Sequence, residues 1–225
     1  MNIMREGSML DRTFTFLGQM IALNLLWMIC SLPIITAGAS TTALFYCMLK
    51  LRKYDDVRVF KDFFSSFKQN FVQSTLVWIV MAVLAGLVWM EKDAASQAQG
   101  DMSGILGLMI VAFCIPIVMT ALYIFPVIAA FENKIGKLAA NAFYFSVRKF
   151  GSTLAMAVIT ILPMTMTLVD AELFPVYLFI WLLFGFSLTA YADSWFIWKQ
   201  FKPYFKDEDD EDPKYKDLET DRYAL

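Results

Sequence analysis

The chain has 225 residues, of which 59% are hydrophobic and only 18% are charged, and its net charge is −2. Soluble domains carry about 25% charged residues, so this composition excludes a large soluble domain. The sequence has no histidine, which removes the commonest general base, metal ligand and pH switch in proteins. The small net charge indicates no particular partner, and we expect no nucleic-acid partner.

Long runs without any Asp, Glu, Lys or Arg dominate the chain. A charge at the centre of a bilayer costs about 2.5–3.5 kcal/mol on insertion scales, and a span needs about 20 apolar residues. We therefore predict an all-α, polytopic membrane protein that is embedded in the lipid bilayer. Residues 1–200 are predicted to form a single transmembrane domain. The six predicted spans are residues 13–33, 34–50, 71–90, 103–130, 151–169 and 173–198.

The basic residues predict the orientation of these spans. With the N-terminus in the cytoplasm, 18 of the 19 Lys and Arg residues fall on the inner side and only Lys92 falls outside. This distribution follows the positive-inside rule. The second run is only about 16 residues long and would reach about 24 Å, short of the ~30 Å hydrocarbon layer. If it did not cross, the N-terminus would lie outside; an extension of its last turn through Lys50 would let it cross.

Small residues open the second predicted span, and amides or hydroxyls occur within several spans. Small residues let helix backbones approach closely in lipid, and a buried amide such as that of Asn24 hydrogen-bonds across helices. We interpret these positions as packing groups, with a ligand or ion passage as the alternative. The candidate packing or binding residues are Asn24, Thr36, Gly38, Ser40, Thr41, Gln73 and Asp193.

The inner segment before the third span has the clearest helical periodicity. Its phenylalanines recur at the i, i+3, i+4, i+7, i+11 spacing of one helical face, and polar residues fill the remainder. This pattern predicts a cytoplasmic amphipathic helix on the membrane surface, near anionic headgroups, or docked on a partner protein. The candidate docking residues are Phe60, Phe63, Phe64, Phe67 and Lys68, with Phe71 completing the stripe.

A second inner segment, between the fourth and fifth spans, predicts a similar amphipathic helix over residues 132–149. At the other end of the chain, residues 207–212 form an unbroken acidic run. Such a block of like charge is typical of a disordered, solvated segment. We therefore expect residues 201–225 to form a disordered cytoplasmic tail.

Catalytic and cofactor-binding patterns are absent from the sequence. It has no HExxH, nucleophile elbow, phosphate loop or paired intramembrane carboxylates, so we expect no enzyme activity, no cofactor and no metal. The three cysteines lie within apolar runs and are interpreted as packing groups. Asp193 is the one acid that continues the helix of a span. We interpret it as an interfacial group paired with an inner-face cation, with an intramembrane functional site as the alternative.

Two segments resemble a known family. The first hairpin contains Asn24-Leu25-Leu26-Trp27, Ser31-Leu32-Pro33 and Gly38-Ala39-Ser40-Thr41-Thr42-Ala43, and the likeness continues through Phe67-Lys68-Gln69-Asn70-Phe71. A second half includes Phe125-Pro126-Val127-Ile128-Ala129-Ala130. These residues resemble the YesL-like family, a bacterial group of small integral membrane proteins classed as a domain of unknown function.

The resemblance implies a six-helix protein of the bacterial plasma membrane, and the distribution of basic residues predicts both termini in the cytoplasm. It also implies an association with carbohydrate uptake, because genes of this family often accompany carbohydrate importers. We therefore expect a non-catalytic accessory protein that contacts the membrane subunits of an ABC importer, and we leave open a homo-oligomer. The alternative is an independent channel or facilitator for a small neutral solute, lined by the hydroxyls and amides named above.

Overall fold

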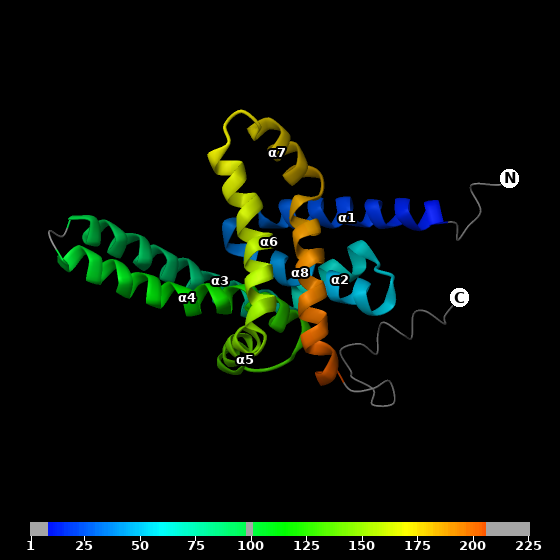
Figure 1. Cartoon of the computed structure of the whole chain (residues 1–225). Coiled ribbons are helices and arrows are strands. Elements are labelled where there is room, and N and C mark those ends of the chain that lie inside the picture. The colour runs from blue at the N-terminus through cyan, green and yellow to red at the C-terminus, as the bar shows by residue number, and fades with distance from the viewer. Residues whose placement is uncertain (1–8, 98–100, 206–225) are drawn as a thin grey trace.

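The computed structural model describes residues 9–97 and 101–205, and this part of the chain is helical, without strands. The helices follow one another with short connections (Figure 1). Their bounds are α1 Met9–Ser31, η1 Ile34–Thr36, α2 Ala37–Tyr54, α3 Val59–Gln97, α4 Asp101–Ala130, α5 Ile135–Arg148, α6 Phe150–Val169, α7 Phe174–Ile180, η2 Trp181–Gly185, α8 Phe186–Phe201 and η3 Lys202–Tyr204.

Six helical segments of the described residues are long and apolar enough to cross a membrane, which confirms the predicted all-α membrane fold. The short second run is one of them, since its helix continues past Lys50 to Tyr54 and gives a 21-residue segment. At ~1.5 Å per residue this segment reaches the thickness of the hydrocarbon layer. The six segments are Arg12–Ser31, Ile34–Tyr54, Val59–Met90, Gly107–Ala130, Phe150–Val169 and Phe174–Tyr204.

Helix α2 forms the centre of the helix assembly. Every residue from Thr42 to Leu51 is buried, and the helix packs against α1, α3, α4 and α8. The small residues at its start allow this close packing. A Cβ atom on Gly38 would lie 2.5 Å from the backbone oxygen of Ser74 and 2.7 Å from Cβ of Trp78 in α3. The small-residue face of α2 is therefore part of the protein's own core.

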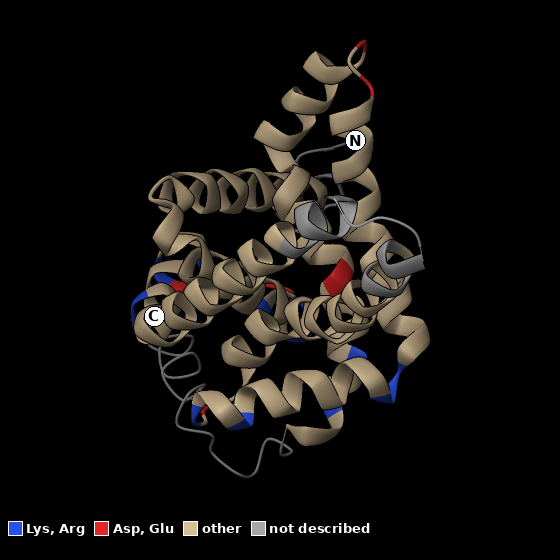
Figure 2. Ribbon diagram, turned by 90° about the vertical axis from the view of Figure 1, so that its left-hand side faces the viewer, with Lys and Arg blue, Asp and Glu red and all other residues tan. Residues whose placement is uncertain are grey.

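Two helical hairpins diverge from a common base. In Figure 1 the α3–α4 hairpin extends to the left, whereas α6, α7 and α8 rise vertically, so that the tips of the two hairpins lie far apart. The base holds α5 and the C-terminal end of α8, and the α2–α3 connection lies above it on the right of Figure 1. Lys and Arg gather in the lower half of the molecule in Figure 2, and the turn at the top carries acidic residues. The described cations thus concentrate toward the base.

The phenylalanine-rich segment is the first part of α3, which runs from Val59 to Gln97 without a break. The amphipathic segment between spans 2 and 3 is therefore helical as predicted, but it continues directly into the third span instead of forming a separate helix. Its aromatic stripe is also divided between two environments. Phe63 is fully buried and Phe67 packs against the core, whereas Phe60 is 65% exposed and Phe64 is 38% exposed.

A polar stripe on α3 faces the interior. Asp62, Ser66, Asn70 and Ser74 follow one another at intervals of four residues, and each is at most 5% exposed. Asn70 Nδ2 donates to the backbone oxygen and to Oγ of Ser66, and Ser74 shares a 2.8 Å hydrogen bond with Thr42 of α2. Two of the polar residues that fill the remainder of the predicted amphipathic helix, Asp62 and Ser66, therefore face the interior.

The second inner segment does form a separate amphipathic helix, α5, as predicted. It buries Leu138, Ala142 and Phe145 in the core and leaves Phe143 and Tyr144 exposed. The predicted tail boundary is wrong by a few residues, because Phe201 at the end of α8 is fully buried. The remainder of the predicted tail, residues 206–225, lies outside the described residues.

Candidate functional site

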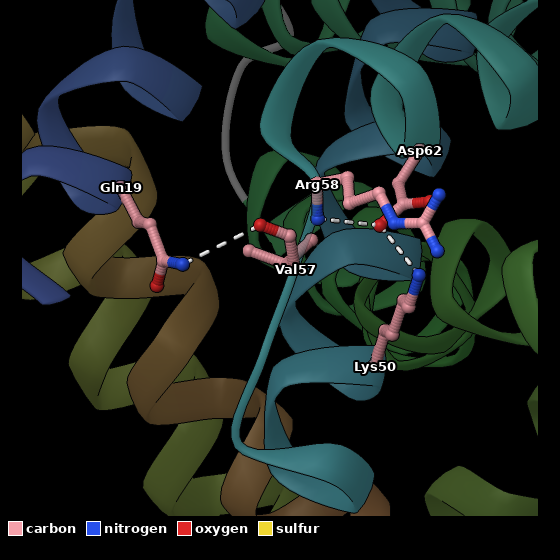
Figure 3. A network of polar contacts seen from close by, with 5 residues as sticks. All are labelled: Gln19, Lys50, Val57, Arg58 and Asp62. Atoms are coloured by element: carbon pink, nitrogen blue, oxygen red, sulfur yellow. Dashed lines mark hydrogen bonds and ion pairs between the residues drawn. The ribbon is translucent and has the colours of Figure 1, made fainter. Parts of the chain in front are cut away.

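A buried ion pair joins the C-terminal part of α2 to the start of α3. Lys50 Nζ lies 2.6 Å from Asp62 Oδ2, and the same oxygen accepts a 2.8 Å hydrogen bond from the backbone N–H of Arg58 (Figure 3). Asp62 thus binds a backbone group at the start of α3, where the helix dipole favours a negative charge. Gln19 of α1 donates to the carbonyl of Val57 at 3.4 Å, so that three helices meet at the α2–α3 connection.

Asn24 bridges α1 to a π-helical turn between α7 and α8. Its Nδ2 donates to the carbonyl oxygens of Trp181 and Leu182, each at 2.9 Å, and its Oδ1 accepts from the backbone N–H of Ser187 at 3.0 Å. The π turn spans Trp181–Gly185. Because a π turn interrupts the regular α-helical bonding pattern, the amide of Asn24 satisfies backbone groups that would otherwise lack partners in lipid.

The residues of the alternative passage are not brought together. Thr36 donates to the carbonyls of Cys30 and Pro33 in the first hairpin, and Ser40 is fully buried and donates to the carbonyl of Thr36. Gln73 donates to the carbonyl of Asn133 at 2.7 Å, beside the α4–α5 connection. These bonds distribute the predicted hydroxyls and amides over separate contacts between helices.

Asp193 lies inside the helix assembly, not at its boundary. It is 3% exposed, and its Oδ2 accepts a 2.9 Å hydrogen bond from Oγ1 of Thr160 in α6. Its other oxygen, Oδ1, is buried without a hydrogen-bond partner. The nearby cation Lys199 instead lies 3.4 Å from the ring centroid of Trp195. The interpretation of Asp193 as an interfacial acid paired with a cation is therefore wrong.

A cavity of about 240 Å³ lies beside Asp193. Its lining comes from five helices and the π turn, and of the candidate residues predicted from the sequence it includes only Thr41 and Asp193. Most of the wall is aliphatic or aromatic. The lining residues are Trp27, Thr41, Leu44, Phe45, Ala121, Leu122, Phe125, Thr160, Met164, Trp181, Phe186, Thr189, Ala190 and Asp193.

Sequence reasoning missed several polar contacts of the interior. Gln200 donates to the hydroxyl of Tyr123 at 2.8 Å, and this hydroxyl shares a 3.2 Å hydrogen bond with Thr153. Arg52 lies 3.8 Å from the ring centroid of Tyr191 and donates to its carbonyl oxygen and to Ser194. No local pattern indicates these pairs. Among the described residues, no group of three His, Cys, Asp or Glu side chains is placed to hold a metal ion.

Residues 20–91 match the family described as protein of unknown function, DUF624. YesL-like proteins are members of this family, so the match confirms the resemblance over the segment that holds the first hairpin, α2 and most of α3. No curated protein and no solved structure matches the chain.

Proposed function

We propose that this chain, whose residues 20–91 match the DUF624 family, acts as a non-catalytic partner of a carbohydrate importer. It would reside in the bacterial plasma membrane with both termini in the cytoplasm. The concentration of Lys and Arg toward the base of the molecule (Figure 2) supports this orientation, because positive charge favours the cytoplasmic side.

The observation that carries the proposal is an exposed aromatic pair at the start of α3. Phe60 and Phe64 lie one helical turn apart and are 65% and 38% exposed, and the side chains of Lys61 and Lys68 beside them are also exposed. Aromatic residues are enriched in the cores of protein interfaces. Together these residues form a surface, here called the Phe60 patch, with which a membrane subunit of an importer would make contact.

The Phe60 patch is presented on a rigid support. Directly behind it, Phe63 is fully buried and Asp62 forms the ion pair with Lys50. About three turns further along α3, the Thr42–Ser74 bond and the close approach at Gly38 fix α3 against α2. A surface that is already ordered loses little conformational entropy on binding, which favours partner contact. The small-residue face of α2 takes no part in this contact, because it is buried.

The proposal is tested by cross-linking in intact cells. A photoreactive amino acid replacing Phe60 should cross-link to the membrane subunits of a carbohydrate importer, identified by mass spectrometry after purification in mild detergent. Cross-links to lipid alone would contradict the proposal and indicate a membrane-surface role for the Phe60 patch.

A pair of matched variants locates the contact. Phe60→Asp with Phe64→Asp should lower recovery of the importer subunits at least tenfold. Phe143→Asp with Val147→Asp alters equally apolar exposed positions on α5, which are 45% and 51% exposed, and should leave recovery unchanged. Equal losses in both variants would show that general disturbance of the base, and not the Phe60 patch, controls the association.

A further inference from the structure

Asp193, a residue in the wall of the cavity, has one carboxylate oxygen that the protein leaves unsatisfied. Asp193 is 3% exposed, Thr160 donates to its Oδ2, and Oδ1 has no partner among the described residues. An ionised carboxylate in an apolar environment is strongly destabilised unless a donor or a positive charge pairs with it. The cavity thus offers a binding partner for a hydrogen-bond donor or a cation.

The polar side chains in the wall provide acceptors but no free donor. Trp27 Nε1 donates to Thr41 Oγ1 at 3.1 Å, and Thr41 donates in turn to the carbonyl of Ala37. Thr189 donates to the carbonyl of Gly185 at 2.8 Å, and Thr160 donates to Asp193. The last N–H group, Nε1 of Trp181, donates to Thr167 at 2.8 Å.

This distribution of donors selects among ligand classes. An anion or a ligand with only acceptors would find no donor and would be repelled by the carboxylate. A sugar needs several donors and acceptors around it, and a wall that is otherwise aliphatic or aromatic would leave most of its hydroxyls unsatisfied. The volume of about 240 Å³ lies below the usual ~300–1,000 Å³ of ligand pockets, so the ligand must be small.

Aromatic rings line the same cavity as the acid. Trp27 stacks on Phe186 with ring centroids 4.1 Å apart, and Trp181 lies 4.7 Å from Phe186. The faces of such rings attract organic cations, especially where water is excluded. We propose that this cavity binds a small organic cation, such as a short alkylammonium, with its charged nitrogen near Asp193 Oδ1 and its alkyl part among the rings. This inference does not depend on the importer partnership.

The test uses calorimetric titration of the full-length protein in detergent, in a phosphate buffer free of amines. n-Butylammonium should bind at least tenfold more tightly than n-butanol, which has the same alkyl chain without the charge. Butyrate should show no binding. Failure of the ammonium ion to bind more tightly than the alcohol, or binding of butyrate, would overturn the proposal. This comparison needs no variant and so does not depend on whether a variant folds.

Substitutions then assign the binding to Asp193. Asp193→Asn keeps the shape of the side chain and should weaken n-butylammonium binding at least tenfold. Asp170→Asn is the matched control, because Asp170 lies at the α6–α7 turn and accepts from the backbone N–H of Leu173, away from the cavity. Its affinity should equal that of the unaltered protein. Equal affinity of Asp193→Asn, or an equal loss in both variants, would overturn the assignment.

Discussion

Lys50 and Asp62 form an ion pair of 2.6 Å with side chains that are only 8% and 2% exposed. The pair joins the end of the most buried helix, α2, to the first turn of α3, and Asp62 also accepts the backbone N–H of Arg58. Both residues lie in the sequence among other charged residues of an inner segment, and the structure buries these two. The pair thus positions the start of α3 and the Phe60 patch beside it.

Breaking this pair should destabilise the protein more than removing both charges. Lys50→Met leaves the Asp62 carboxylate buried without its cation and should cost about 3–5 kcal/mol. Asp62→Asn retains an acceptor for Arg58 but removes the charge. The double variant should lose at least 1 kcal/mol less than the sum of the single losses, because neither charge then remains unpaired. Unfolding in detergent, followed by tryptophan fluorescence, measures these differences, and additive losses would contradict the coupling.

The close approach of α2 and α3 at Gly38 predicts a strong effect of one methyl group. Gly38→Ala would place Cβ 2.5 Å from the backbone oxygen of Ser74, so the two helices must move apart at a cost of about 1–3 kcal/mol. Gly18→Ala is the control, because no atom lies within 4 Å of its added Cβ. Alanine favours a helix over glycine by about 0.5–1 kcal/mol, so this variant should be slightly more stable. Equal thermal stability of the two variants would argue against close packing at Gly38.

The positions of the membrane helices could be predicted from the sequence because the cost of burying charge in lipid applies to each segment separately. Helix α6, Phe150–Val169, coincides with a charge-free run, and the first and second spans meet at the predicted turn. The extension of α2 through Lys50 to Tyr54 follows from the same length argument.

The buried face of α3 could not be predicted from hydrophobic periodicity. In a membrane protein apolar side chains are as stable against lipid as against the core, so Phe60 and Phe64 face outward while Asp62 and Ser66 face inward. The signal that was present is the four-residue spacing of Asp62, Ser66, Asn70 and Ser74. In lipid, such a polar stripe indicates the protein-facing side of a helix.

The environment of Asp193 could not be predicted for a different reason. Its hydrogen-bond donor, Thr160, lies 33 residues earlier in the chain. The rings that line the cavity come from α1, α2, α4, the π turn and α8. The packing of these helices depends on contacts such as Gly38 with Ser74, which no single-segment pattern contains. Sequence position alone therefore favoured the nearby lysine as a partner.

Asn24 should be important for stability because it satisfies three backbone groups around the π turn. Asn24→Leu would leave the carbonyls of Trp181 and Leu182 without these donors, and the expected loss is about 1–2 kcal/mol. Gln73→Leu removes an amide that bonds to the exposed carbonyl of Asn133, where water can replace it, and should cost less than about 0.5 kcal/mol. Thermal unfolding in detergent compares the two, and a similar loss for Gln73→Leu would contradict the structural role of Asn24.

The proposed orientation predicts opposite labelling of two exposed acidic positions. Asp56 lies in the α2–α3 connection, on the right of Figure 1, and Glu172 lies in the α6–α7 turn at the top. In a background without Cys30, Cys47 and Cys114, Glu172→Cys should react with a membrane-impermeant thiol reagent in intact cells. Asp56→Cys should react only after permeabilisation, because the Lys and Arg residues around the α2–α3 connection favour its placement on the cytoplasmic side. The reverse result would invert the orientation. Reaction of both positions from outside would contradict the six-span arrangement, in which three spans separate Asp56 from Glu172 and so place them on opposite sides of the membrane.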